Sequence, residues 1–269
     1  MLPEEILSRL DILPLEGLRI HEQTIPENVR ALRETMLNLG RIVDPLIVDR
    51  KNRVVLDGNH RREVLAAMDC ENAVCQVVDY DDPSIRIGVW YPASLSLTTA
   101  LGGEKVDKAA GKAALDRMEA CFMLVKKENG QEECRLFPSS DRQLRAVLDD
   151  QEKLLRKWAP TAGPANGNGN GMQYIEDNRD QFFLDLGYGV LERRPFSKQE
   201  VVAEALAGRP LPPKSTRHHI PNRIIRLNFH LGYLNETPET AKLLLAEMVK
   251  KRVKYGSARY YTEPVIVLY

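Results

Sequence analysis

The chain has 269 residues, of which 43% are hydrophobic and 28% charged, values typical of a globular protein with one large domain or two smaller ones. Lys plus Arg and Asp plus Glu each total 38, so the formal net charge is zero, which argues against a dedicated nucleic-acid-binding protein. No apolar run has the length of a membrane span, and residues 1–5 lack the basic start of a signal peptide. We therefore expect a cytoplasmic protein without a membrane partner; the oligomeric state stays open.

Short strands and helices alternate in the first third of the chain. A helix over 26–39 is predicted by Pro26 near its start, a one-sided apolar pattern and Gly40 at its end. Apolar runs at 45–48 and 54–56 flank a polar turn and predict a hairpin or a short excursion of the chain. We expect these elements to form a compact α/β domain over residues 1–92.

The rest of the chain, 93–269, is predicted to form a second α/β domain. Asn129-Gly130 predicts a hairpin turn between two strands, and Ser197 with Glu200 predicts a capping box. Further predicted elements are helices at 142–158, 174–184 and 237–253 and strands at 224–229 and 264–269. Residues 159–171 are rich in Gly, Asn and Ala and predict a flexible loop. They have no preceding strand and no following Lys-Ser/Thr, so they do not predict a phosphate loop.

Four cysteines, Cys70, Cys75, Cys121 and Cys134, show no CxxC spacing. Their spacing favours free thiols in a reducing compartment. A metal site or a regulatory thiol stays open.

The stretch Val54-Val55-Leu56-Asp57-Gly58-Asn59-His60-Arg61 passes from an apolar strand through a polar turn into a helical pattern. Such a turn brings backbone N–H groups and the positive end of the helix dipole together, which suits a phosphate. His60 and Arg61 add further donors, and arginine can bind phosphate through two parallel hydrogen bonds. Two interpretations of Asp57 stay open, a helix N-cap and a magnesium ligand. The turn itself is either a phosphate site or an ordinary strand–helix junction.

Asp-Gly-x-His-Arg after an apolar strand resembles the signature of the ParB/sulfiredoxin-like superfamily, in which this turn binds nucleotide phosphates. Three more motifs resemble the free L-serine kinases of that superfamily in order and spacing: His21-Glu22, Val89-Trp90-Tyr91-Pro92-Ala93 and Lys214-Ser215-Thr216-Arg217-His218. The resemblance covers most of the chain, and Tyr260-Tyr261-Thr262-Glu263 is similar to the siderophore-linked branch. It implies a mixed α/β fold with a ParB/sulfiredoxin-like N-terminal nucleotide-binding domain, a C-terminal substrate domain, and an active site in the cleft between them.

The activity implied by this resemblance is phosphorylation of free L-serine to O-phospho-L-serine, with ATP or ADP as donor and Mg²⁺ as cofactor. Carried over by position, Glu22 is the general base, and Asp57 also holds the magnesium ion. The nucleotide-binding positions are Asp57, Gly58, Asn59, His60 and Arg61, and the substrate-binding positions are Trp90, Thr216, Arg217 and His218. Asn59 departs from the histidine of the archaeal kinases. Glu27 lies one position away from a second expected acid, and whether it takes part stays open.

Side-chain chemistry agrees with these roles. A carboxylate can take the proton of the serine hydroxyl, and Arg217 with Thr216 can bind the carboxylate of a zwitterionic amino acid. Trp90 can exclude water from a small site, although a tryptophan in the core and an arginine in a surface ion pair are the ordinary alternatives.

Three other classes of protein would share part of this pattern. A ParB-type DNA-associated nucleotide switch would need a helix-turn-helix and a basic face, and the sequence shows neither. A sulfiredoxin-like reductase would need a cysteine where Asn59 stands. A nucleotide-binding regulatory protein without kinase turnover stays an alternative. The sequence leaves the choice between ATP and ADP, and the pathway served, undecided.

Overall fold

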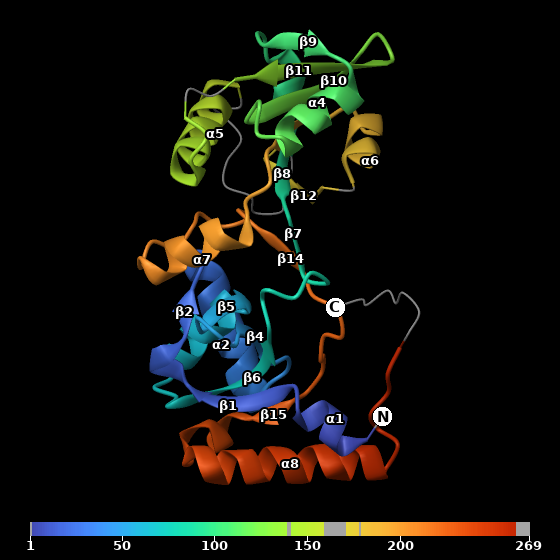
Figure 1. The fold of residues 1–269 in the computed structure, drawn as a ribbon. Coiled ribbons are helices and arrows are strands. Elements are labelled where there is room, and N and C mark those ends of the chain that lie inside the picture. The colour runs from blue at the N-terminus through green and yellow to red at the C-terminus, as the bar shows by residue number, and fades with distance from the viewer. Residues whose placement is uncertain (1, 139–140, 159–170, 178, 262–269) are drawn as a thin grey trace. The chain divides into compact units, whose positions relative to one another are not determined.

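The computed structural model describes residues 2–138, 141–158, 171–177 and 179–261 (Figure 1). Close contacts divide the chain into two units. The first comprises residues 1–84, 202–213 and 220–269, and the second comprises 85–201 and 214–219. The predicted flexible loop, apart from Gly171, and the predicted closing strand fall outside the described residues.

The sequence predicted a single boundary at residue 92, whereas these contacts assign residues 202–213 and 220–269 to the first unit. The placement of the active site in a cleft between two domains stays a prediction. Within the described ranges, no helix combines the length and the apolar character that a membrane crossing requires.

The first unit contains a five-stranded mixed sheet in the order β1-β6-β4-β5-β2. Its strands are β1 (Leu10–Pro14), β2 (Arg19–Ile20), β4 (Leu46–Asp49), β5 (Val54–Asp57) and β6 (Asn72–Val78). The predicted hairpin is confirmed, because β4 and β5 pair antiparallel. Strand β3 (Arg41–Ile42) pairs separately with β15 (Phe229–His230).

Helices accompany this sheet: α1 (Pro3–Leu7), α2 (Pro26–Leu39), α3 (Asn59–Ala66) and α8 (Pro238–Lys254). The predicted helix over 26–39 is confirmed, and Gly40 ends it in the left-handed conformation at φ +63°. Helix α8 buries Ala241, Leu245 and Val249, four residues apart on one face, in the same core as the strands. This apolar face is why the end of the chain packs with its beginning.

The second unit contains a six-stranded antiparallel sheet in the order β12-β8-β13-β10-β11-β9. Its strands are β8 (Trp90–Ser94), β9 (Glu104–Val106), β10 (Phe122–Glu128), β11 (Gln131–Phe137), β12 (Gln173–Glu176) and β13 (Gly189–Arg193). The predicted turn between β10 and β11 is confirmed, since Asn129 and Gly130 both have positive φ, at 52° and 79°. The helices are α4 (Lys108–Asp116), α5 (Leu144–Trp158) and α6 (Asp180–Asp185).

A two-stranded ribbon, β7 (Arg86–Gly88) with β14 (Arg217–His219), also belongs to the second unit. Helix α7 (Lys198–Leu206) begins in the second unit and ends in the first. Its predicted capping box is confirmed: the Ser197 N–H donates to the Glu200 carboxylate at 2.8 Å, and the Glu200 N–H donates to Ser197 Oγ at 3.2 Å.

Two predicted elements were wrong. The expected strand over 224–229 is limited to β15, because Arg226 and Asn228 have φ of +53° and +47°, which a strand does not allow. The expected helix over 174–184 is replaced by β12 and the short helix α6.

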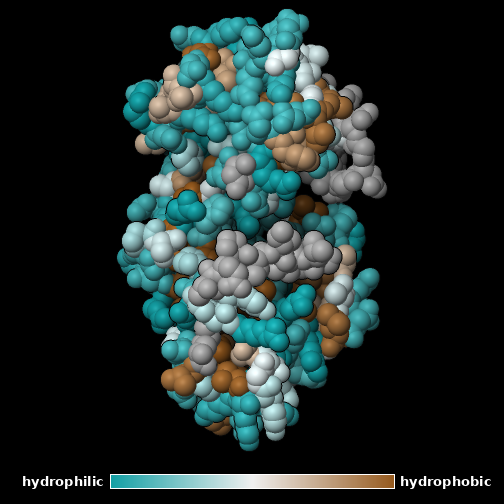
Figure 2. All heavy atoms as spheres, turned by 90° about the vertical axis from the view of Figure 1, so that its right-hand side faces the viewer, coloured by the Kyte–Doolittle hydropathy of each residue, from teal (hydrophilic) through white to brown (hydrophobic). Residues whose placement is uncertain are grey.

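The predicted free thiols are confirmed, since all four cysteines are free and buried. Burial raises the pKa of the Cys134 thiol to about 11, so this cysteine stays a protonated, unreactive thiol at neutral pH. The face seen in Figure 2 is mostly hydrophilic, with hydrophobic residues in small separate groups.

Candidate functional site

The turn formed by residues 57–61, which we call the Gly58 turn, joins β5 to α3 in the first unit. Gly58 is the N-cap residue of α3, with φ +98° and ψ 25°, a conformation that favours glycine. The N-cap position is occupied by Gly58, which has no side chain, so the interpretation of Asp57 as the N-cap residue is wrong. The first N–H groups of a helix have no partner within it, and the turn therefore presents backbone donors and the positive end of the helix dipole. These are the elements of an anion site.

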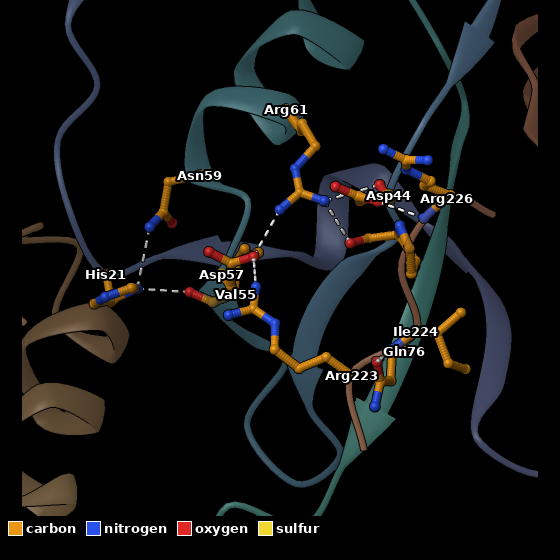
Figure 3. Close-up of polar contacts among 11 residues, drawn as sticks. His21, Asp44, Val55, Asp57, Asn59, Arg61, Gln76, Arg223, Ile224 and Arg226 are labelled. Atoms are coloured by element: carbon orange, nitrogen blue, oxygen red, sulfur yellow. Dashed lines mark hydrogen bonds and ion pairs between the residues drawn. The ribbon is translucent and has the colours of Figure 1, made fainter. Parts of the chain in front are cut away.

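The Arg61 side chain stabilises the Gly58 turn through hydrogen bonds to Asp44, Pro45 and Asp57 (Figure 3). Its Nη1 donates to the backbone oxygens of Asp44 and Pro45 at 2.8 and 2.7 Å, and its Nη2 donates to Asp57 Oδ2 at 2.7 Å. A Cβ on Gly58 would lie only 3.1 Å from three atoms of this guanidinium group. Glycine is therefore favoured at position 58 both by its backbone conformation and by the close approach of Arg61.

Asp57 has a second arginine partner that the sequence did not indicate. Arg223 Nη2 also donates to Asp57 Oδ2, and Figure 3 shows the two guanidinium groups reaching this carboxylate from different sides. The side chains of Asp57 and Arg223 are 33% and 32% exposed. The carboxylate thus lies at the surface of the turn between two cations.

The segment that carries Glu22 lies against the Gly58 turn at two points. His21 is buried, and its Nδ1 donates to the Val55 oxygen at 2.6 Å and lies 3.3 Å from Asn59 Nδ2. Three residues after Glu22, the Ile25 N–H donates to His60 Nε2 at 3.1 Å. The structure therefore brings the backbone of the segment that carries Glu22 against the turn within the first unit.

Leu211 holds the same segment from its other side. The Leu211 N–H donates to the His21 oxygen at 2.7 Å, and the Gln23 N–H donates to the Leu211 oxygen at 2.8 Å. The Glu22 side chain between them is 16% exposed. Glu27, in contrast, has a side chain that is 63% exposed and pairs with Arg30 at 3.2 Å, the arrangement of an ordinary helix-surface ion pair.

Asn59, the first residue of α3, carries a buried polar atom without a partner. The residue is 9% exposed, and among the described residues no hydrogen-bond donor reaches its Oδ1. Buried amide oxygens are nearly always hydrogen-bonded in folded proteins. This oxygen lies at the N-terminal end of α3.

The predicted substrate residues belong to the second unit, where four side chains form what we call the Trp90 cluster: Trp90, Glu176, Lys214 and Arg217. Lys214 Nζ lies 4.5 Å and the Arg217 guanidinium carbon 5.5 Å from the centre of the Trp90 ring. Arg217 Nε donates to Glu176 Oε1 at 3.2 Å. The cluster offers two cations, one carboxylate and an aromatic face, and its Glu176 was missed because the sequence predicted a helix there.

Thr216, just before β14, and His218 within it are 6% and 5% exposed, while Arg217 between them is half-buried, as expected for the alternation of side chains in an extended segment. The structure thus separates Arg217, which reaches Trp90, from its two more deeply buried neighbours.

Arg193, which is 1% exposed, fixes the segment that precedes β14. Its guanidinium group donates to the backbone oxygens of Ser215 and Arg194 and stacks 4.0 Å from the Phe196 ring centre. The sequence did not predict this role, although the charged pair Arg193-Arg194 at the end of an apolar strand is a feature that could have indicated it.

Glu192, next to Arg193, is a fully buried carboxyl group. Neither of its oxygens has a hydrogen-bond partner among the described residues, and Lys112 Nζ lies 3.9 Å away. Burial raises its pKa to about 7 against the opposing attraction of Lys112. This group therefore titrates near neutral pH.

The Gly58 turn offers one carboxylate, that of Asp57, as a possible ligand for a magnesium ion. In nucleotide sites this ion is commonly held by one or two carboxylates together with phosphate oxygens and water. Asp57 is a surface carboxylate beside the uncapped end of α3. Within the described ranges, no three or more His, Cys, Asp or Glu residues form a metal-binding group. A magnesium ion at Asp57 would thus depend on the nucleotide for other ligands.

The chain is similar in sequence and in fold to known proteins. No protein-family model matches the sequence. An ATP-dependent L-serine kinase of Staphylothermus marinus is 24% identical over 228 residues, covering 78% of this chain and 85% of the relative. An ADP-dependent L-serine kinase of Thermococcus kodakarensis is 22% identical over 216 residues, covering 78% of this chain and 86% of the relative.

Solved structures give the same picture. SbnI from Staphylococcus aureus, truncated at its C-terminus, matches 95% of this chain and all of its own length with a TM-score of 0.66 at 17% identity. A free serine kinase in complex with AMP matches 84% of this chain and 93% of its own with a TM-score of 0.60 at 18% identity. The chain therefore has the mixed α/β fold of these proteins. The resemblance to the free L-serine kinases, predicted from four motifs, is confirmed.

Proposed function

We propose that this protein is a nucleotide-dependent kinase that phosphorylates free L-serine to O-phospho-L-serine. The observation that carries the proposal is the contact of the Glu22 segment with the Gly58 turn, where the Ile25 N–H donates to His60 Nε2 close to the N-terminal end of α3. The sequence similarity to ATP- and ADP-dependent L-serine kinases supports it. ATP or ADP is the phosphoryl donor in this proposal.

Glu22 acts as the general base. A serine hydroxyl is a weak nucleophile until a carboxylate within hydrogen-bond reach takes its proton as the bond to phosphorus forms. Glu22 is mostly buried, and its neighbours on both sides are fixed by Val55 and Leu211, so its position is set before substrate binds. Such pre-arrangement is what a positioned base needs.

The Gly58 turn binds the phosphates of the nucleotide through Gly58, Asn59, His60, Arg61 and the N–H groups that begin α3. Phosphoryl transfer depends mainly on positioning and on neutralising the charge of the phosphate oxygens. Magnesium, held by Asp57 and the nucleotide, would add positive charge there. A cytoplasmic location accompanies the proposal, because the nucleotide donor is found there and four free cysteines are typical of a reducing compartment.

The Trp90 cluster binds the amino acid. Free serine is a zwitterion, and the cluster contains both cations and a carboxylate. Arg217 binds the α-carboxylate, and Glu176 binds the α-ammonium group. Trp90 excludes water from the site. Thr216 and His218, the buried neighbours of Arg217 in the chain, are the other two substrate-binding residues in this proposal and hold Arg217 in place.

The test is an assay of the purified protein with L-serine, Mg²⁺ and either ATP or ADP, with O-phosphoserine detected by mass spectrometry. We expect phosphoserine with at least one donor, and none with D-serine. Nucleotide binding without phosphoserine for any donor would instead favour the regulatory protein without turnover.

A further inference from the structure

Arg223 lies beside the Gly58 turn although it is more than 160 residues away in sequence, and its position follows from a fixed backbone. The segment 221–228 contains no helix or strand. Gln76, a buried residue of β6, donates through Nε2 to the Asn222 oxygen at 2.9 Å and accepts the Ile224 N–H through Oε1 at 2.8 Å. Both polar atoms of this glutamine thus hold the residues that flank Arg223.

A second side chain fixes the same segment further along. Asp44 Oδ1 accepts the Arg226 N–H at 2.7 Å, while the Asp44 backbone oxygen accepts Arg61 Nη1. In Figure 3 the Arg223 side chain extends from this anchored backbone toward Asp57, whereas that of Arg226 lies on the other side of Asp44. The fold therefore fixes which arginine of the segment reaches the turn.

The two arginines on Asp57 differ in how many of their donors the protein uses. Arg61 is 17% exposed, and both of its Nη atoms donate to protein oxygens. Arg223 is 32% exposed, and within the described ranges only its Nη2 has a hydrogen-bond partner. Since a guanidinium group has five N–H donors, the partly exposed Arg223 keeps donors that form no hydrogen bond with the described residues.

We propose that Arg223 is the arginine that binds the nucleotide phosphate at the Gly58 turn, and that Arg61 serves to hold the turn in shape. This inference rests on the proposed function and changes one of its assignments, because it moves phosphate binding from the Arg61 side chain to that of Arg223. Asp57 orients Arg223 in the absence of nucleotide, and the charge-assisted hydrogen bonds of its remaining donors go to phosphate oxygens. Because partly exposed ion pairs contribute little to stability, removing Arg223 leaves the fold intact.

The first experiment measures ADP and adenosine binding by calorimetry with EDTA present, so that no divalent cation contributes. We expect Arg223→Ala to weaken ADP binding about tenfold or more, since the loss of one hydrogen bond to a charged group typically lowers affinity by this factor. Adenosine binding should not change, because adenosine has no phosphate. Arg226→Ala is the matched control from the same segment and should bind ADP like the wild type. Equal ADP affinity of Arg223→Ala and wild type would overturn the inference.

A double variant separates phosphate contact from simple neutralisation of Asp57. If Arg223 only neutralised that carboxylate, then Arg223→Ala would have no effect in an Asp57→Asn background. We expect the double variant to bind ADP several-fold more weakly than Asp57→Asn alone. Equal affinities would assign Arg223 to Asp57 and overturn the inference. Thermal unfolding of each variant checks that the fold is retained.

The outcome is distinguishable from failure of the proposed function. If the wild type makes phosphoserine but Arg223→Ala binds ADP normally, then only the role of Arg223 is wrong. If the wild type neither binds a nucleotide nor makes phosphoserine, the proposed function fails and this inference fails with it.

Discussion

The Gly58 turn and the Trp90 cluster are assembled in different ways. The turn consists of five consecutive residues at a strand–helix junction, and a glycine with positive φ sets its shape. The Trp90 cluster takes its four side chains from β8, β12, β14 and the loop before β14. The first site is therefore local, whereas the second depends on strand register and on the buried groups that maintain it. Substitutions far from the cluster should disturb it more than they disturb the turn.

The largest effect is expected at Arg193. Arg193→Ala leaves two buried carbonyl oxygens without their donor, and each hydrogen bond to a charged group contributes about 1.5–3 kcal/mol. We expect a loss of about 3–6 kcal/mol in the free energy of unfolding, measured by urea denaturation. A substitution of the equally buried Arg194 would not be a suitable control, because it would also break the ion pair with Glu200. Arg193→Lys, which keeps the positive charge at position 193, is the conservative variant. An Arg193→Ala protein as stable as the wild type would show that β14 needs no such clamp.

The next effect concerns pH and Glu192. A carboxyl group whose pKa rises from 4.5 to about 7 on folding binds more protons in the folded state, so stability falls as pH rises between these values. Between pH 5 and 8 the wild type should lose about 2–3 kcal/mol relative to Glu192→Gln. Urea denaturation of both proteins across this range measures it. A constant stability difference would mean that Glu192 does not titrate in the folded protein near neutral pH.

Arg217→Ala tests the chemistry of the Trp90 cluster. Loss of a charge-assisted contact to the serine carboxylate should raise the KM for serine about tenfold or more, with ADP affinity unchanged. The matched control is Arg179→Ala, since the Arg179 guanidinium group likewise lies near an aromatic ring, 5.4 Å from the centre of the Phe182 ring. Steady-state kinetics with varied serine measures both variants. An equal KM in both would remove Arg217 from the substrate site.

Alanine substitutions at two glycines test whether the shape of the Gly58 turn matters for nucleotide binding. Gly58→Ala and Gly40→Ala both force alanine into a positive φ, and each should cost about 1–2 kcal/mol of stability. A Cβ at Gly58 would also meet Arg61, whereas at Gly40 it would meet nothing within 4 Å. Only Gly58→Ala should therefore weaken ADP binding, by several-fold in calorimetry. Equal ADP affinity in the two variants would show that the shape of the turn does not matter for binding.

The Gly58 turn was predictable because its signal is local: three apolar residues, Asp-Gly and then a helical pattern. The hairpins and the helix at 26–39 were predictable for the same reason. The expected strand at 224–229 was wrong because the hydrogen bonds of that segment go to Gln76 and Asp44, which are more than 140 residues away. Since Arg223 owes its position to those contacts, no local pattern indicated it.

In the second unit, even less of the site could be predicted from local sequence patterns. Trp90 and Arg217 were identified through a family resemblance, but their neighbour Glu176 was assigned to a helix. Its place opposite Trp90 comes from the pairing of β12 with β8, between residues 86 positions apart in the chain. A sequence pattern predicts that a strand exists but leaves its partner open. Helix α8 was likewise predicted correctly, while its membership of the first unit follows from tertiary packing alone.

The most direct test of the central claim is a comparison of Glu22→Gln with the wild type in the phosphoserine assay. If Glu22 is the base beside the nucleotide phosphates, phosphoserine formation should fall by about 10²-fold or more. ADP affinity and the unfolding temperature should stay near the wild-type values, since the amide keeps the size of the side chain. A variant that makes phosphoserine at the wild-type rate would contradict the assignment of Glu22.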